Sequence, residues 1–164
     1  MDNFEQQILE LKEQHKQGFL GTWAFDQSES NLDDLLDVMF EIDKDDIKFR
    51  SVLEMYEIHR LEKYDWAPPY LLQLLEQVRN TSLMKNSSII AMVSETSGNG
   101  YGWHDDMFDI VVTNVCGTCT WEFEDGTKQL LKPFDVMFVP KGVRHTVVGH
   151  SPRFSAALGC NQVE

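Results

Sequence analysis

Two histidines and one aspartate stand out because their types and spacing suit a metal site. His104 and Asp106 form an H-x-D pair just before the apolar run FDIVVTNV, and His145 follows the run DVMFV and the turn PKG. We expect the H-x-D pair at the start of a strand, where residues two apart point to the same face. Two imidazoles and one carboxylate are the set that holds non-haem Fe(II) and leaves coordination positions open. The pattern predicts a metal site formed by these three residues.

The first half of the chain carries most of the charge and is typical of helices with short extended pieces. Apolar spacing predicts an amphipathic helix over about residues 3–19. Asn31 is a good N-cap for a second helix, LDDLLDVMFEI. Pro69 suits the first position of a third helix, where its missing N–H costs nothing. Residues 47–59 fit either a strand or a helix.

From about residue 87 the texture changes to short apolar or alternating runs separated by glycine-rich turns. Asp125-Gly126 between two extended runs is a strong hairpin signal. Closely spaced strands without intervening helices favour a sandwich or jelly roll over a parallel α/β sheet. We therefore expect a mainly β fold in a single domain, residues 1–164. Residues 87–164 would form a double-stranded β-helix, with the mostly helical residues 1–86 packed against it.

Two stretches carry a family resemblance. SIIAMVSETSGNGYGWHDDMFDIVVTNVCGTCTWEFEDGT resembles the metal-binding core of the cupin-like JmjC family, the hydroxylases that include the ribosomal-protein oxygenases. PFDVMFVPKGVRHTV resembles the second cupin motif, and together the match covers roughly residues 87–160. The resemblance implies a cupin barrel and Fe(II)- and 2-oxoglutarate-dependent hydroxylation. It also implies that His104, Asp106 and His145 are the iron ligands.

The sequence departs from that family at the cosubstrate site. Family members usually bind the distal carboxylate of 2-oxoglutarate with a Lys or Arg after the glycine turn, but Cys119 stands at the matching position. A buried carboxylate without a cationic partner costs several kcal/mol, so another cation is needed. Arg153 and Ser155 on the expected last strand are similar to the clamp of other 2-oxoglutarate oxygenases. A tight turn over 149–152 would place both on the inner face with His145.

Other candidates for the pocket follow from strand parity and loop position. Counting on from the metal pair, Asn114 faces inward, where it could hydrogen-bond a cosubstrate oxygen or be satisfied by backbone. After the glycine turn, Cys119 and Trp121 would point inward, Trp121 as core packing or substrate contact. Tyr101 and Trp103 lie on the loop that enters the site and are candidates for substrate contact.

Two other readings of the same residues stay open. The chain could be a metal-binding cupin that holds a ligand without turnover, or a cupin enzyme that does not use 2-oxoglutarate, and the metal could be a divalent ion other than iron. Many such cupins use three His and one Glu, whereas this chain has Asp106 in place of the second His. The C-x-x-C of Cys116 and Cys119 joins two expected strands. It therefore lacks the helix N-terminus of a redox dithiol and the four ligands of a zinc site.

Composition narrows the partners and the location. The 164 residues carry a formal charge of −13, which argues against nucleic acid or acidic lipid as a partner. No run approaches the roughly 20 apolar residues of a membrane helix, and the acidic N-terminus is unlike a signal peptide. Three cysteines argue against a secreted disulfide scaffold. We expect a cytoplasmic protein that acts on a small molecule or peptide, with the N-terminal helices as a candidate homodimer interface.

Overall fold

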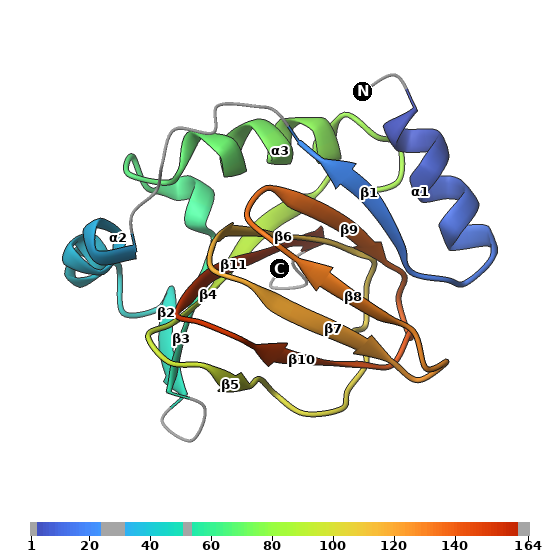
Figure 1. Cartoon of the computed structure of the whole chain (residues 1–164). Helices are drawn as coiled ribbons and strands as arrows, with labels where there is room; N and C mark the ends of the chain where they lie inside the picture. The colour runs from blue at the N-terminus through green and yellow to red at the C-terminus, as the bar shows by residue number, and fades with distance from the viewer. Residues whose placement is uncertain (1–2, 24–31, 51–53, 161–164) are drawn as a thin grey trace.

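Two antiparallel β-sheets, one of seven strands and one of four, face each other, and helices α1 and α3 lie along the outside of the larger sheet (Figure 1). The computed structural model describes residues 3–23, 32–50 and 54–160. The helical elements are α1 (Phe4–Glu13), α2 (Leu32–Val38), η1 (Met39–Glu41), η3 (Leu61–Lys63) and α3 (Pro69–Arg79). Within these residues no helix is long and apolar enough to cross a membrane.

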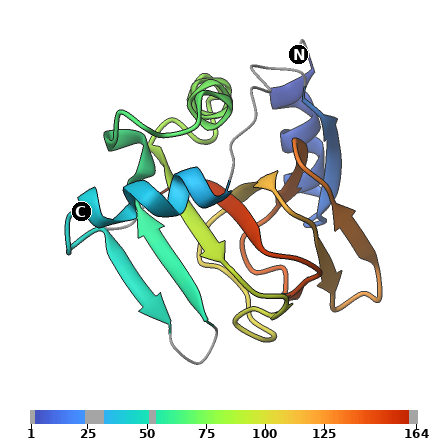
Figure 2. The same cartoon turned by 60° about the vertical axis from the view of Figure 1, so that its left-hand side comes forward.

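The strands of the larger sheet come from both halves of the chain. In spatial order they are β1 (Gly18–Thr22), β9 (Asp135–Val139), β6 (Ile110–Cys116), β11 (Arg153–Cys160), β4 (Ser87–Ser94), β3 (Met55–His59) and β2 (Ile47–Arg50). Figure 2 shows β1 (blue) at one edge and the β2–β3 hairpin (cyan) at the other.

The smaller sheet comes entirely from the second half of the chain. Its strands, in spatial order, are β5 (Gly98–Asn99), β10 (His145–Gly149), β7 (Cys119–Phe123) and β8 (Lys128–Leu131). From β4 to β11 the chain passes repeatedly between the two sheets, which is the jelly-roll arrangement of a double-stranded β-helix. The predicted fold class is therefore confirmed.

Strand β11 shows how the larger sheet separates two environments. Phe154 and Leu158 face the helices and belong to the main apolar core, whereas Arg153 and Ser155 face the space between the sheets. The core side is covered by α3, which begins at Pro69 as predicted and buries a continuous apolar face. Burial of each Leu and Val side chain on this face of α3 contributes about 1.5–3 kcal/mol to the stability of the fold. This packing leaves the opposite face of β11 available for polar groups.

In the N-terminal portion, one predicted helix is shorter than expected, and one segment of ambiguous pattern proves to contain strands. The helix predicted over 3–19 ends at Glu13, because His15 takes a left-handed conformation and Gly18 packs against Leu11 at the start of β1. Residues from Gly18 onward pair with β9, so backbone pairing decides their conformation rather than apolar spacing. Residues 47–59, predicted ambiguously, contribute strands β2 and β3. The N-cap Asn31 lies outside the described residues.

A buried carboxylate ties β2 to the segment after β3. Asp46 is fully buried and accepts hydrogen bonds from Lys63 Nζ at 2.6 Å and Tyr64 Oη at 2.6 Å. Arg60 also donates to it, through Nε at 2.9 Å and through Nη2. Burial acts to raise the pKa of Asp46, but these donors outweigh it and hold the pKa well below its usual range. The ionised carboxylate therefore stabilises the fold.

We predict that Asp46→Asn lowers the free energy of unfolding by about 1–3 kcal/mol at pH 7, because buried donors lose their charged acceptor. Since the folded pKa is depressed, this stabilisation is present above about pH 4 and is lost as the pH falls further. The gap between variant and wild type should therefore narrow at pH 3. Urea unfolding at both pH values measures this.

Asp43→Asn is the matched control, since Asp43 also pairs with Lys63, at 2.8 Å, but is exposed. Its loss should cost about 0.5 kcal/mol or less. Equal stability of the two variants at pH 7 would contradict the role given to Asp46.

Candidate metal centre

His104 and Asp106 lie on the extended segment that joins β5 to β6. The prediction placed them at the start of a strand, but β6 begins only at Ile110. The segment is nevertheless extended: Trp103, Asp105 and Met107 are exposed, while the residues between them are more covered. His104 and Asp106 therefore share a face for the predicted reason, although regular sheet pairing is missing.

A pair of backbone hydrogen bonds joins this segment to the second histidine. The His104 N–H donates to the His145 carbonyl at 2.9 Å, and the His145 N–H donates to the His104 carbonyl at 2.8 Å. His145 is the first residue of β10 and is 1% exposed. The two imidazole rings consequently lie with centroids 4.5 Å apart.

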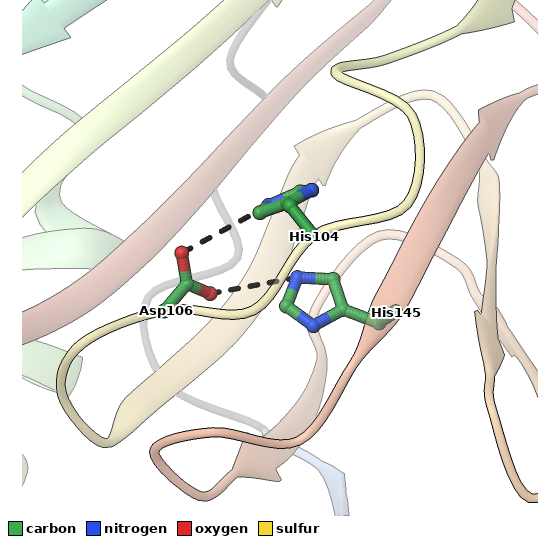
Figure 3. A group of neighbouring side chains, drawn as sticks. All are labelled: His104, Asp106 and His145. Atoms are coloured by element: carbon green, nitrogen blue, oxygen red, sulfur yellow. Dashed lines mark ion pairs between the residues drawn. The ribbon is translucent and has the colours of Figure 1, made fainter.

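The three side chains converge as Figure 3 shows. Asp106 Oδ1 lies 3.9 Å from His104 Nε2, and Asp106 Oδ2 lies 3.4 Å from His145 Nε2. One ligand atom from each of the three residues lies within 4.8 Å of the other two. The structure thus brings together all three residues of the predicted metal site.

Hydrogen bonds on the far side of each ring set the tautomers. His104 Nδ1 lies 2.8 Å from the Gly102 carbonyl, and His145 Nδ1 lies 2.9 Å from the Val143 carbonyl. A carbonyl only accepts, so each Nδ1 carries a proton, and Nε2 is the ring nitrogen that faces Asp106 and can bind a metal. Burial lowers the pKa of His145, which further favours its neutral form. Two imidazoles that direct Nε2 to one point beside a carboxylate fit a divalent transition metal.

The triad opens onto a cavity of about 350 Å³ between the two sheets. Its walls are largely apolar, with Ile90 and Val112 from the larger sheet and Val147 from the smaller. The ring of Trp121 packs against His145 with centroids 4.8 Å apart and lines the same cavity. Such a site can hold a small ligand beside a metal.

Arg153 extends from β11 into this cavity and is 5% exposed. Gly149 and Gly117 make room for it, since a Cβ at Gly149 would lie 1.8 Å from Arg153 Nη1 and one at Gly117 would lie 2.7 Å from Arg153 Cβ. Within residues 3–23, 32–50 and 54–160, no carboxylate forms an ion pair with its guanidinium. Burial lowers the pKa of Arg153, but the ordinary pKa of an arginine is so high that the guanidinium stays charged.

Ser155 and Asn114 lie beside Arg153 but are occupied by each other. The Ser155 hydroxyl donates to Asn114 Oδ1 at 2.7 Å, and Asn114 Nδ2 donates to the Leu131 carbonyl at 3.0 Å. Cys119 is fully buried behind Asn114, with Sγ 3.4 Å from Asn114 Nδ2. Burial raises the pKa of the Cys119 thiol, so the thiol stays neutral. Asn114 and Ser155 both line the cavity, whereas Cys119 does not, and the role of Asn114 and Ser155 toward a cosubstrate stays a prediction.

The two aromatic residues of the entrance loop point in different directions. Tyr101 lines the cavity, and its hydroxyl donates to Glu57. Trp103 is 46% exposed and is not among the residues that line the cavity. Of the four residues predicted for the substrate pocket, Tyr101 and Trp121 therefore reach the cavity, while Trp103 and Cys119 do not.

Glu57 on β3 was missed by sequence reasoning. It lines the cavity and accepts hydrogen bonds from Tyr101 and from His59 Nε2 at 2.5 Å. Burial acts to raise the pKa of Glu57, but these partners lower it overall, so the group is ionised. Only the register that pairs Glu57 with Met92 of β4 reveals its position, since residues 47–59 had no clear pattern.

Comparison with known proteins supports the fold. No family model and no curated protein matches the chain. The solved structure of the ribosomal oxygenase YcfD from Escherichia coli matches with a TM-score of 0.70 at 14% identity, covering 95% of this chain and 52% of that one. A structure of YcfD with cobalt and 2-oxoglutarate matches with a TM-score of 0.55 at 14% identity, over 67% of this chain and 32% of that one.

A cupin-2 domain protein from Shewanella frigidimarina matches with a TM-score of 0.41 at 20% identity, over 48% of this chain and 74% of that one. Fold and site together define a double-stranded β-helix with a His-Asp-His group that could bind a metal. The match to the ribosomal oxygenase includes nearly all of this chain but only about half of the oxygenase.

We predict that His145→Ala and Asp106→Ala each abolish measurable Co(II) binding, because either change removes one of only three protein ligands in the described site. Titration followed by calorimetry and by the visible absorption of Co(II) measures this. His150→Ala is the matched control, since His150 is exposed and lies beyond the end of β10. Unchanged Co(II) affinity in either triad variant would refute the site.

Proposed function

We propose that the protein is an Fe(II)- and 2-oxoglutarate-dependent oxygenase that hydroxylates a small molecule or a peptide. The observation that carries the proposal is the Arg153 guanidinium, which faces the same cavity as the triad without a carboxylate partner in the described part of the chain. A buried cation without a counter-ion is costly, so it indicates a site for an anion. The cavity therefore combines a metal-ligand set with an anion site.

The cosubstrate 2-oxoglutarate has the chemistry to bind both a metal held by the triad and the Arg153 guanidinium. Its keto-acid end suits the open positions beside His104, Asp106 and His145, and its distal carboxylate needs a cation inside the barrel. Arginine presents two parallel N–H donors that match a carboxylate, so Arg153 can fill this role. With Arg153 there, the neutral Cys119 need not supply a charge. The fold likeness to a YcfD structure with cobalt and 2-oxoglutarate supports the same choice.

Neighbouring residues hold the metal-ligand triad and Arg153 in place. Trp121 packs on His145 and limits rotation of its ring, while the carbonyls of Gly102 and Val143 fix both Nε2 atoms toward the site. The Ser155 hydroxyl donates a hydrogen bond to Asn114 and lines the cavity beside Arg153, so we assign it a secondary role in holding the cosubstrate.

Fe(II) bound by the triad would supply the activation of dioxygen that C–H hydroxylation requires. The chain itself supplies the ligand atoms, the cation for the cosubstrate and a cavity that holds the substrate near the metal. Glu57 and Tyr101 form the polar part of the cavity wall on the β3 side and are the groups we assign to substrate contact.

We predict that Arg153→Met weakens 2-oxoglutarate binding by about 2–5 kcal/mol, since it removes one partner of a buried charge pair. Calorimetry in the presence of Mn(II) measures this. Gly149→Ala should also weaken binding, because the new Cβ displaces the guanidinium while its charge is kept. Ser155→Ala should have the smaller effect.

Arg144→Met is the matched control, because Arg144 is an exposed arginine next to His145 and should leave 2-oxoglutarate binding unchanged. Succinate release by the iron-loaded protein, with and without 2-oxoglutarate, tests turnover. Wild-type 2-oxoglutarate affinity in Arg153→Met would refute the anion site. Substrate conversion without 2-oxoglutarate would instead favour a different cupin enzyme.

A further inference from the structure

Asp109 joins three parts of the chain near the candidate metal centre. Its Oδ1 accepts a hydrogen bond from the Lys141 N–H at 2.9 Å, and its Oδ2 lies 2.9 Å from Lys12 Nζ. The side chain of Asp109 is 14% exposed and that of Lys12 is 45% exposed. Asp109 does not belong to the group of side chains that could ligate a metal. Asp109 instead contacts the segments that surround the candidate metal ligands.

The two segments that Asp109 connects are those that carry the metal ligands. Lys141 belongs to the turn that leads into His145, and Asp109 follows Asp106 on the other segment. Next to this contact, the Gly142 N–H donates to the Asp106 carbonyl at 3.0 Å. Together with the backbone bonds between His104 and His145, these contacts fasten the segments on both sides of Asp106. Loss of the Asp109 carboxylate would free one side.

Helix α1 provides the charge that balances Asp109. Lys12 stands in the last turn of α1, whose apolar face is anchored by Phe4 and Ile8 in the core. Just after the helix, His15 lies beside Gly142, because a Cβ on Gly142 would be 3.6 Å from His15 Cε1. The end of α1 therefore rests against the same turn that Asp109 holds.

We propose that Asp109 is a positioning residue for the metal centre, and that Lys12 assists it by fixing the Asp109 carboxylate from α1. The proposal rests on the metal site of the proposed function but not on 2-oxoglutarate or on turnover. Residues that support metal ligands typically change metal affinity 10- to 100-fold when removed. Because all three ligand residues remain in the chain, loss of Asp109 would change the affinity and geometry of metal binding rather than remove the site.

The test is Co(II) affinity and visible absorption in the full-length chain. Asp109→Ala should weaken Co(II) binding about 10- to 100-fold and alter the Co(II) spectrum. Asp109→Asn keeps an acceptor for Lys141 but loses the charge, and Lys12→Met loses only the ion pair, so each should weaken binding about two- to five-fold. The double variant should be no weaker than Asp109→Asn, because the same pair is already broken.

Lys128→Met is the matched control, since it breaks another exposed ion pair, with Glu122 at 3.3 Å, on the smaller sheet. It should leave the Co(II) affinity unchanged. Unaltered affinity and spectrum in Asp109→Ala would overturn the proposal. If Asp109→Ala does not fold, Lys12→Met decides: a Co(II) affinity equal to that of Lys128→Met overturns it. Failure of the unchanged protein to bind Co(II) would overturn the metal site itself.

Discussion

The reciprocal backbone hydrogen bonds between His104 and His145 are the interaction on which the site depends. They join an irregular extended segment to the start of β10, and they set the position of both rings at once. Because extended backbone alternates its side chains, fixing His104 also directs Asp106 to the same face. The hydrogen bonds from each Nδ1 to a carbonyl then leave both Nε2 atoms facing the carboxylate. The three candidate ligands thus converge because of backbone geometry, without a metal to hold them together.

Two buried charges show how structural and functional ions differ in this chain. Asp46 is fully buried, but three side chains donate to it, so its charge is balanced within the protein. Arg153 is almost as well buried and faces a cavity, and the described part of the chain places no carboxylate against it. A balanced buried ion stabilises the fold, whereas an unbalanced one requires a ligand. This contrast distinguishes Arg153, on which the proposed anion site rests, from the many surface charges of an acidic protein.

The N-terminal portion completes the barrel as well as covering it. Strands β1, β2 and β3 extend the larger sheet at both edges, and β3 brings Met55 and Glu57 to the cavity. Lys12 of α1 reaches the segment that carries the first two metal ligands. The cavity is therefore lined by residues from β3 to β11, and α1 contacts the segment that carries two of the candidate metal ligands.

Local features could be predicted from the amino-acid sequence: the strands after residue 87, the helix start at Pro69, and the ligand types His, Asp and His with an inward-facing Arg153. Each of these depends on neighbouring residues, on side-chain alternation or on a recognisable motif. The end of α1 at Glu13, the strand conformation of β2 and β3, and the place of Glu57 in the cavity wall all follow from long-range contacts. The same holds for Trp103, which points outward, and for the contacts of Asp109. These features depend on pairing between segments distant in the chain, and the register of such pairing is set by the whole sheet rather than by local propensity.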